Sequence, residues 1–195
     1  MNGRPRTYLD AADLFVFFSD LQTSVHGLTL TIAYERLRRS ARVLARLANL
    51  FELPALATCI PEPGGAAPEV IPEIGATLDH VARFTCTTFN AFDDPGVRAA
   101  IEGSGRRTLL LAGVATELAV QWAALTAAAE GYAVYLLLDA CGGFDRRSED
   151  AALRRMMVAG CRAFSVPALA SELAGAFTQA KEVAAIDVLF TIADP

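Results

Sequence analysis

Short apolar runs alternate along this chain with longer segments of helical periodicity, and this alternation restricts the folds open to it. A run that is apolar at nearly every residue is typical of a strand buried on both faces, as in a parallel sheet. The helical segments between such runs supply the crossovers that neighbouring parallel strands require. We expect strands within Leu14–Asp20, Leu53–Ile60, His80–Phe84, Arg107–Val114, Tyr132–Ala140 and Cys161–Val166. The sequence therefore predicts a three-layer α/β/α, Rossmann-like fold with a doubly wound, mostly parallel six-stranded sheet.

Several of the helical segments carry boundary signals. Helices are expected at residues 34–51, 93–105, 117–130, 148–160 and 168–180. Pro95 stands near the first turn of the segment 93–105, and Gly131 closes the segment 117–130. Ser148 is a candidate N-cap. Residues 61–75, in contrast, hold too many Pro and Gly residues for either regular element.

Size and charge exclude some function classes. With 195 residues, 53% of them hydrophobic, the chain is expected to form one domain, residues 1–195, with a substantial core. The net charge of −5 and the pI near 5.1 argue against a nucleic-acid partner, which requires a basic surface. A group of arginines at helical spacing is interpreted as a solvated helix face. These arginines are Arg36, Arg38, Arg39, Arg42 and Arg46.

The sequence also bears on location and cofactors. Neither a signal-peptide core nor an apolar run of membrane-spanning length occurs, so no membrane partner is expected. The four cysteines, Cys59, Cys86, Cys141 and Cys161, lack the spacing of a metal site, and serine-hydrolase, P-loop and dinucleotide motifs are missing. We therefore expect a cytoplasmic protein with neither a metal nor an organic cofactor.

Ligands of doubly wound sheets bind beyond the carboxyl ends of the strands, where the strand order reverses. The residues expected there are Asp20, Cys59 and the segments 83–92, 113–119 and 139–144. Asp20 follows an apolar strand, and partial burial would raise its pKa toward a range useful for acid/base catalysis. A turn-stabilising role for Asp20 is equally consistent with the sequence. Arg83 could face Asp20 or grip an anionic substrate, or it could be an ordinary surface arginine.

The segment LLLAGVATELAV, residues 109–120, predicts a buried strand, a sharp turn and the start of a helix. Backbone N–H groups without partners gather at such a helix start and favour negative charge. A cysteine there would be largely a thiolate, but the position holds Ala119, which cannot attack a substrate. Good helix propensity is the simpler interpretation of Ala119. Cys86 and Cys141 are alternative nucleophiles, although free cysteines are more often small buried hydrophobes.

Several elements in a fixed order carry a family resemblance over nearly the whole chain. They are the D-x-Q element at Asp20 and Gln22, then FNAFDDPG, LLLAGVATELAV, AALTAAAEGYAVYLLLDACGGF and RRMMVAGCRAFSV. By these elements the chain resembles the isochorismatase-like cysteine hydrolases, and within them the small single-domain bacterial members that form homo-oligomers. The resemblance implies a hydrolase that acts on a small molecule.

The resemblance also implies a triad of aspartate, lysine and nucleophilic cysteine. Asp20 matches the aspartate, Arg83 falls at the lysine position, and Ala119 occupies the cysteine position of the G-x-x-T-x-x-C pattern. The non-proline cis peptide of the family would fall at Val114–Ala115, a strain that usually accompanies a functional site. The residues expected to line the substrate are Gln22, Phe89, Phe92, Thr116, Glu117, Leu118 and Trp122.

Three explanations of Ala119 stay open. The first is a hydrolase without covalent catalysis, like the true isochorismatases of the family, which cleave a vinyl ether. Asp20 would then be the acid or base, Arg83 would bind an anionic group, and N–H groups at Glu117–Ala119 would stabilise negative charge. The second is a catalytically degenerate member that serves as an oligomeric binding or structural protein. The third is a deliberate replacement of the cysteine, which would restore the cysteine amidohydrolase interpretation.

Self-association is a further expectation. The segment EVAAIDVLF near the C-terminus is apolar, and the helix LAVQWAALTAAA is apolar nearly all round. Burial of such surface against another subunit is the usual solution, although both segments could simply be core.

Overall fold

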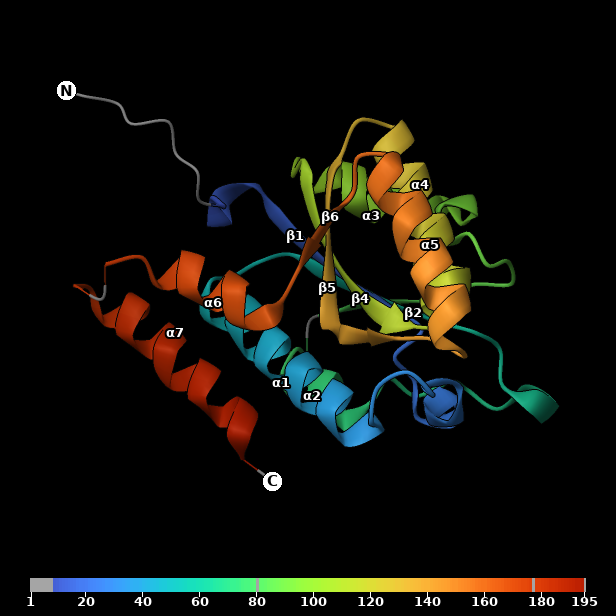
Figure 1. Ribbon diagram of the computed structural model, residues 1–195, viewed down its shortest axis with the longest axis horizontal. Coiled ribbons are helices and arrows are strands. Elements are labelled where there is room, and N and C mark those ends of the chain that lie inside the picture. The colour runs from blue at the N-terminus through green and yellow to red at the C-terminus, as the bar shows by residue number, and fades with distance from the viewer. Residues whose placement is uncertain (1–8, 80, 177, 195) are drawn as a thin grey trace.

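The computed structural model describes residues 9–79, 81–176 and 178–194. All six strands join one sheet in the order β3-β2-β1-β4-β5-β6, and every neighbouring pair is parallel (Figure 1). The strands are β1 (Leu14–Ser19), β2 (Ala55–Cys59), β3 (Ala82–Thr85), β4 (Thr108–Val114), β5 (Ala133–Gly142) and β6 (Arg162–Phe164). This arrangement confirms the predicted doubly wound sheet, and its strand order reverses between β1 and β4.

Helices cover both faces of the sheet. They are α1 (Tyr34–Leu50), α2 (Pro72–Gly75), α3 (Pro95–Gly103), α4 (Gln121–Ala129), α5 (Arg146–Val158), α6 (Val166–Ala174) and α7 (Ala180–Phe190). The helices α1, α2, α6 and α7 share one cluster of buried side chains, and α3, α4 and α5 share the other (Figure 1). The three-layer α/β/α architecture is therefore confirmed. None of the described helices is both long and apolar enough to cross a membrane.

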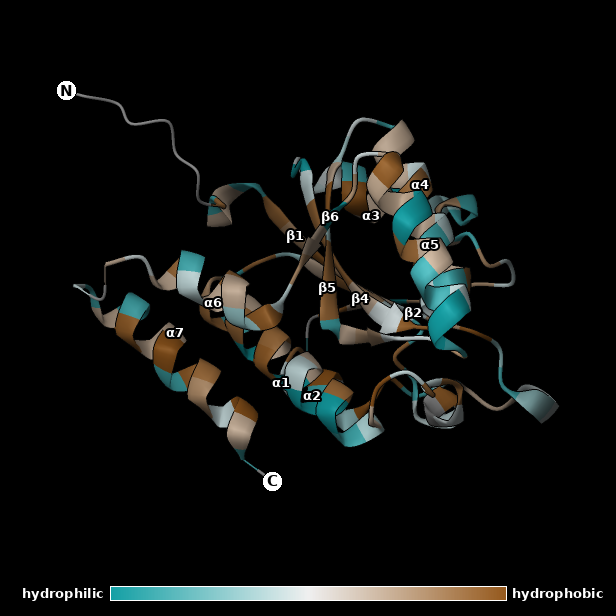
Figure 2. Ribbon diagram, viewed as in Figure 1, coloured by the Kyte–Doolittle hydropathy of each residue, from teal (hydrophilic) through white to brown (hydrophobic). Residues whose placement is uncertain are grey.

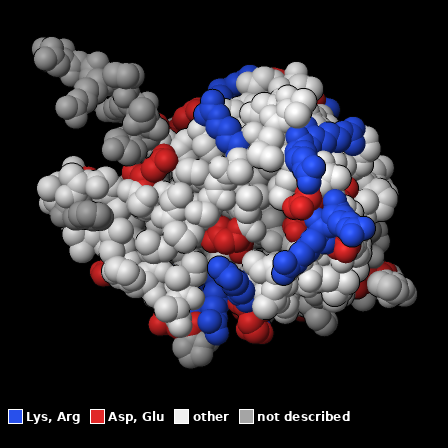
Figure 3. All heavy atoms as spheres, in the orientation of Figure 1, with Lys and Arg blue, Asp and Glu red and all other residues white. Residues whose placement is uncertain are grey.

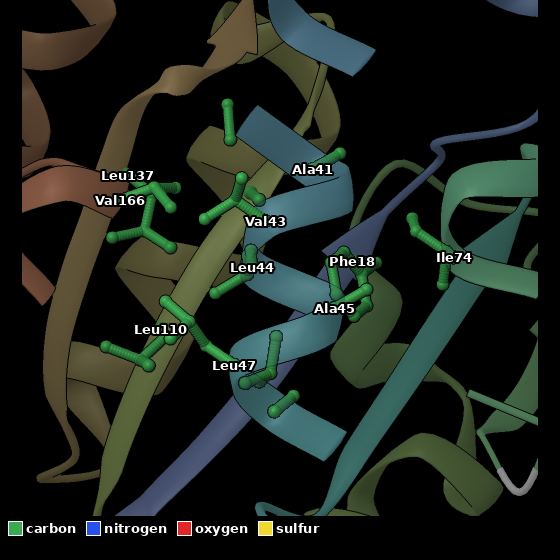
Figure 4. Close-up of a cluster of buried hydrophobic side chains, with 14 of the residues drawn as sticks. Phe18, Ala41, Val43, Leu44, Ala45, Leu47, Ile74, Leu110, Leu137 and Val166 are labelled. Carbon is green, nitrogen blue, oxygen red and sulfur yellow. The ribbon is translucent and has the colours of Figure 1, made fainter. Parts of the chain in front are cut away.

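Alternate residues of β1 pack on the two faces, because successive side chains of a strand point in opposite directions. Val16 and Phe18 pack under α1, whereas Phe15 and Phe17 pack under α3 and α4. α1 adds a stripe of buried leucines to the first cluster, visible around Leu44 in Figure 4. Each such side chain stabilises the fold by about 1.5–3 kcal/mol. Figure 2 shows the strands as mostly hydrophobic and the outward face of α5 as hydrophilic.

The start of α5 corrects the prediction of Ser148 as its N-cap. Asp145 has an extended backbone and accepts a hydrogen bond from the backbone N–H of Arg147. The carboxylate of Asp145 thus satisfies a free N–H group three residues before the predicted cap, and Ser148 lies inside the first turn. The hydroxyl of Ser148 instead donates to Glu117.

The chain after β6 forms two helices instead of one. The helix predicted over 168–180 ends at Ala174, because Gly175 adopts a positive φ of 58°. A separate helix, α7, then includes the apolar segment near the C-terminus and packs against α6 and α1. Phe177, which the prediction placed in the helix, lies outside the described residues.

The punctuated segment 61–75 holds regular structure that its composition did not predict. Val70 forms an antiparallel bridge to Gln22, and the short helix α2 follows it. The bridge anchors this segment to the residues after β1. His80, at the start of the predicted third strand, lies outside the described residues.

The first part of the strand β5 pairs on both sides, whereas its second part pairs with β4 alone. It pairs with β6 only from Tyr135 to Leu137, and its register with β4 shifts between Leu136 and Cys141. The segment from Leu138 onward therefore continues past the described end of β6 (Figure 1). As a result, Leu138 and Asp139 line surface cavities beside α1.

Candidate functional site

Asp20 lies directly after β1 in an unusual backbone conformation. Its φ of 53° is in the left-handed region, which a non-glycine residue rarely adopts. The Asp20 N–H donates to the carbonyl oxygen of Thr58 on β2 (3.1 Å), and the Thr58 hydroxyl donates to Oδ1 of Asp20 (2.8 Å). The carboxyl end of β2 therefore fixes both the backbone and the carboxyl group of Asp20.

The environment of the Asp20 carboxyl group favours its neutral form. The residue is 9% exposed, and burial raises the pKa of the carboxyl above its ordinary value, an effect that the hydrogen bond from Thr58 reduces. No described residue bonds to Oδ2, and this oxygen is not fully enclosed. Asp20 can thus present one oxygen to a bound molecule, either as a proton donor or as an acceptor.

The side chain of Gln22 is committed to contacts within the protein. Its Oε1 accepts from the backbone N–H of Ile60 (2.7 Å), and its Nε2 donates to Glu62 (2.8 Å) and Ser24 (2.9 Å). The residue is almost fully buried. Gln22 therefore ties the chain after β1 to the chain after β2, and in this way it supports the position of Asp20.

The turn after β4 approaches β1 closely. A Cβ at Gly113 would overlap the carbonyl oxygen of Ser19, so this position requires glycine. Ala115 then adopts a left-handed φ of 55°, and Thr116–Val120 form a π-helical turn that leads into α4. The predicted cis peptide at Val114–Ala115 is wrong, since all peptide bonds in the described parts of the chain are trans. The left-handed residue and the wider π turn redirect the chain instead.

Thr116 and Glu117 brace this turn against α5 and the loop before it. The hydroxyl of Thr116 donates to Glu149 (2.8 Å). Oε1 of Glu117 accepts from the backbone N–H of Phe144 (2.9 Å) and from the hydroxyl of Ser148 (2.7 Å). Both side chains are therefore used to hold the turn. Their partners lie 27 to 33 residues further along the chain, a distance that local sequence patterns do not reveal.

Ala119 lies inside the π-helical turn and is buried. Leu118 beside it is half-buried, and its N–H donates to the carbonyl oxygen of Ala115 (2.8 Å). The first N–H groups of a helix have no partner within the helix, so this end carries a partial positive charge. The turn thus has the electrostatics that suit an anionic nucleophile, while the side chain at 119 is a methyl group.

No cysteine supplies the missing nucleophile. All four are buried and free. Burial raises the pKa of Cys59 to about 11 and those of Cys86 and Cys141 to about 12, and it also raises the pKa of Cys161. Each is therefore a neutral thiol near neutral pH. Within the described residues, no group of three or more His, Cys, Asp or Glu side chains is placed to hold a metal ion.

Arg83 lies within β3, two residues before the strand ends. Its side chain is exposed and lies near Gly75 of α2. Neither a hydrogen bond nor an ion pair joins Arg83 to Asp20 or to another residue that the structure describes. Its positive charge offsets part of the rise in the pKa of Cys59 that burial causes.

The three predicted aromatic residues have different surroundings. Phe92 is buried in the core beside Phe17, with 6.4 Å between ring centres, and does not line an open space. Phe89 and Trp122 are exposed and share a pocket of about 320 Å³. Arg155 stacks on the Trp122 ring at 5.2 Å. The other residues of this pocket are Thr88, Asn90 and Asp93.

Two residues that hold the site were not predicted from the sequence. Thr58 positions Asp20, and a hydroxyl within an otherwise apolar strand is a signal that could have identified it. Glu149 holds Thr116, but nothing in the local sequence of α5 distinguishes this glutamate from its acidic neighbour Asp150.

The comparisons with known proteins agree on one family. Residues 31–168 match the family model of the isochorismatase domain. The chain is 31% identical over 173 residues to the probable hydrolase YcaC of Escherichia coli K12, covering 87% of this chain and 82% of that protein. The E. coli YcaC structure, described as an octameric hydrolase of unknown specificity, has a TM-score of 0.87 at 29% identity and covers 99% of this chain and 94% of that one. YcaC from Pseudomonas aeruginosa with hexane-2,5-diol and covalent acrylamide has a TM-score of 0.86 at 27% identity, covering 98% and 96%.

Proposed function

Because this chain belongs to the isochorismatase domain family, we propose that it hydrolyses a small amide, imide or vinyl-ether substrate without a cysteine nucleophile. The observation that supports this proposal most is the state of Asp20. Its carboxyl group is buried, its pKa is raised by that burial, and one of its oxygens has no bonding partner in the described chain. A carboxyl group whose pKa is raised in this way can serve as a general acid.

In the proposed reaction, protonated Asp20 transfers the proton on Oδ2 to the substrate atom at which the bond breaks. A water molecule supplies the oxygen that the cleaved carbon gains, and a proton of that water returns to Asp20. The N–H groups of Glu117 and Ala119 stabilise the negative charge that develops on a substrate oxygen, while that of Leu118 bonds to Ala115. Atoms and charges balance over the cycle without a covalent intermediate.

Arg83 and the pocket of Phe89 and Trp122 are the binding contacts that we propose for the substrate. The guanidinium of Arg83 is exposed and has no ion-pair partner among the described residues, so it is available to a substrate carboxylate. Phe89 and Trp122 form an aromatic pocket that can take an apolar part. A small substrate with a carboxylate or carbonyl group suits this combination.

A second candidate function is an oligomeric binding or structural role without turnover. The methyl group at Ala119 favours it, because this side chain cannot form a bond to a substrate. Assembly from several subunits is part of either candidate, since the E. coli relative is described as octameric.

Hydrolysis of isochorismate and of a panel of small amides distinguishes the two candidates. We expect activity in the unchanged protein that Asp20→Asn lowers by about 10²-fold or more, since general acid–base groups contribute typically 10²–10⁴-fold. Asp150→Asn, the same change at an exposed aspartate of α5, is the matched control and should retain activity. Activity that survives Asp20→Asn would contradict the mechanism.

Restoring a cysteine tests the turn itself. In Ala119→Cys, the helix start should lower the pKa of the new thiol, so that it reacts with acrylamide at neutral pH. Ala128→Cys places a more accessible thiol near the opposite end of α4 and should react more slowly. Activity that appears only in Ala119→Cys would indicate a site that lacks its nucleophile. If neither the unchanged protein nor Ala119→Cys hydrolyses a substrate, and acrylamide labels Ala119→Cys and Ala128→Cys equally fast, the binding role would be favoured.

A further inference from the structure

The arginines at helical spacing on α1 do not form one solvated face. Arg38 pairs with acidic side chains, and Arg42 and Arg46 bond to the segment that follows α7. Arg36 and Arg39 have neither a hydrogen bond nor an ion pair with any residue in the described chain. Three of the five charges thus serve the fold, and the remaining two have no structural partner.

Both of these arginines line the same cavity. It has a volume of about 560 Å³ and lies between α1, β5 and the start of α6. Its lining comprises Arg36, Arg39, Ser40, Asp139, Ser165, Pro167 and Ile192. Figure 3 shows this side of the molecule, where basic side chains gather next to acidic ones over the lower end of α1.

The Nε atom of Arg39 is enclosed and unbonded. Its N–H has no acceptor, although it is shielded from solvent. A buried donor without an acceptor costs free energy, so buried donors in native proteins nearly always have a partner, which can be an ion or a ligand. Arg42 has a similarly enclosed Nε, but its Nη2 donates to the carbonyl oxygen of Thr191 (3.0 Å). Arg39 thus lines the cavity with a guanidinium that makes no hydrogen bond in the described chain and has one buried N–H.

The carboxylate of the cavity already accepts a hydrogen bond on each of its oxygens. Oδ1 of Asp139 accepts from the backbone N–H of Val166 (2.8 Å), and Oδ2 accepts from the Ser40 hydroxyl (3.1 Å). The Ser165 side chain accepts from the backbone N–H of Ala168 (3.2 Å) and caps α6. The donors left for a ligand are thus the hydroxyl of Ser165 and the two guanidinium groups, which bind carboxylate and phosphate well.

We propose that this cavity binds a small organic anion. Arg36 and Arg39 hold its carboxylate or phosphate group, and Pro167 and Ile192 contact its apolar part. The volume lies within the range usual for small-molecule sites. None of these residues belongs to the site at Asp20 and Ala119, so the anion site is a second site.

Titration calorimetry of the full chain with phenyl phosphate tests this proposal, with inorganic phosphate as the probe for the charged group alone. We expect saturable 1:1 binding of phenyl phosphate per chain, weaker binding of inorganic phosphate, and a loss of tenfold or more in affinity for Arg39→Gln. Arg36→Gln should lose less, because its side chain is more exposed. Arg154→Gln removes the same charge from an exposed position of α5 and should change the affinity by less than twofold.

Sedimentation of the same variants distinguishes an anion from a second protein chain in the cavity. The proposal expects an unchanged assembly in Arg36→Gln/Arg39→Gln together with lost phenyl phosphate binding. Dissociation of the assembly in that double variant would overturn it, because a partner subunit would then occupy the cavity. Absence of saturable binding to the unchanged protein in the millimolar range, or equal affinity in all variants, would also overturn it.

Discussion

The carboxyl ends of β1 and β4 are neighbours in the sheet, and their backbones are built alike, although the side chains that they present differ. Each leads into a non-glycine residue in the left-handed region, with a φ of 53° at Asp20 and 55° at Ala115. Each is fixed by hydrogen bonds from another part of the chain. After β1, the structure presents a carboxyl group with a raised pKa, whereas after β4 it presents the methyl group of Ala119. The comparison teaches that the backbone of such a site is maintained by its own contacts and needs no reactive side chain.

The largest expected effect comes from a substitution that would push the two strand ends apart. Gly113→Ala places a methyl group against the backbone of Ser19, which cannot move without breaking the pairing of β1 with β4. We expect a loss of about 1–3 kcal/mol or more in the free energy of unfolding, measured by urea denaturation. Gly103→Ala is the control, since a Cβ there meets no atom within 4 Å. Equal stability of the two variants would show that the strands tolerate a wider spacing.

The hydrogen bonds that brace the β4 end give the next effect. Glu117→Ala removes the acceptor of the Phe144 N–H and of the Ser148 hydroxyl, and we expect a loss of about 1–3 kcal/mol in urea denaturation. Ser148→Ala alone should lose less, and the double variant should lose less than the sum, because both changes remove one shared bond. Additive losses would mean that the Glu117–Ser148 contact adds nothing to the brace.

The β1 end should differ from the β4 end in its response to pH. Because burial raises the pKa of Asp20 in the folded state, the folded protein holds this proton at pH values where the unfolded chain has lost it. The Asp20 contribution therefore destabilises the fold progressively as the pH rises above the ordinary value of 3.8 toward the raised pKa. Asp20→Asn should reduce this fall in unfolding free energy between acidic and neutral pH. If the unfolding free energy fell equally with rising pH in Asp150→Asn and in Asp20→Asn, this would argue against a raised pKa of Asp20.

The smallest expected effect concerns the left-handed residue of the β4 end. Ala115→Gly removes the strain of a Cβ at a φ of 55°, and the gain is partly offset by the greater freedom of glycine in the unfolded chain. We expect a net change below about 1 kcal/mol, in the stabilising direction. Ala128→Gly within α4 should instead destabilise by about 1 kcal/mol. If Ala115→Gly and Ala128→Gly both lowered the melting temperature, the turn would not strain Ala115.

The strand ends at the site could be predicted from the sequence because each of them follows a continuous apolar run. Asp20 and the turn at 113–119 were located by that rule, and the structure places both at the reversal of strand order. Arg83 was expected in the segment beyond the carboxyl end of its strand, but β3 continues to Thr85, so Arg83 lies inside the strand. Strand boundaries of this kind depend on pairing with β2, which a single strand does not encode.

The surroundings of individual side chains were harder to predict. Phe89 and Phe92 are three residues apart in one segment, yet Phe89 is 58% exposed and Phe92 is 1% exposed. The bonds of Gln22 to the chain after β2 join residues 38 and 40 apart, and no local pattern indicates them. Tertiary contacts decide these details, and they decide which side chains are left free for a ligand.

The brace around the turn after β4 also has an evolutionary consequence. Its bonds run through Thr116, Glu117 and the backbone, and none involves the side chain at 119. A mutation at that position can therefore change the chemistry of the turn without dismantling it. Every alanine codon becomes a serine codon by one base change, so Ala119→Ser, which places a hydroxyl at this helix start, lies a single mutational step from the present sequence.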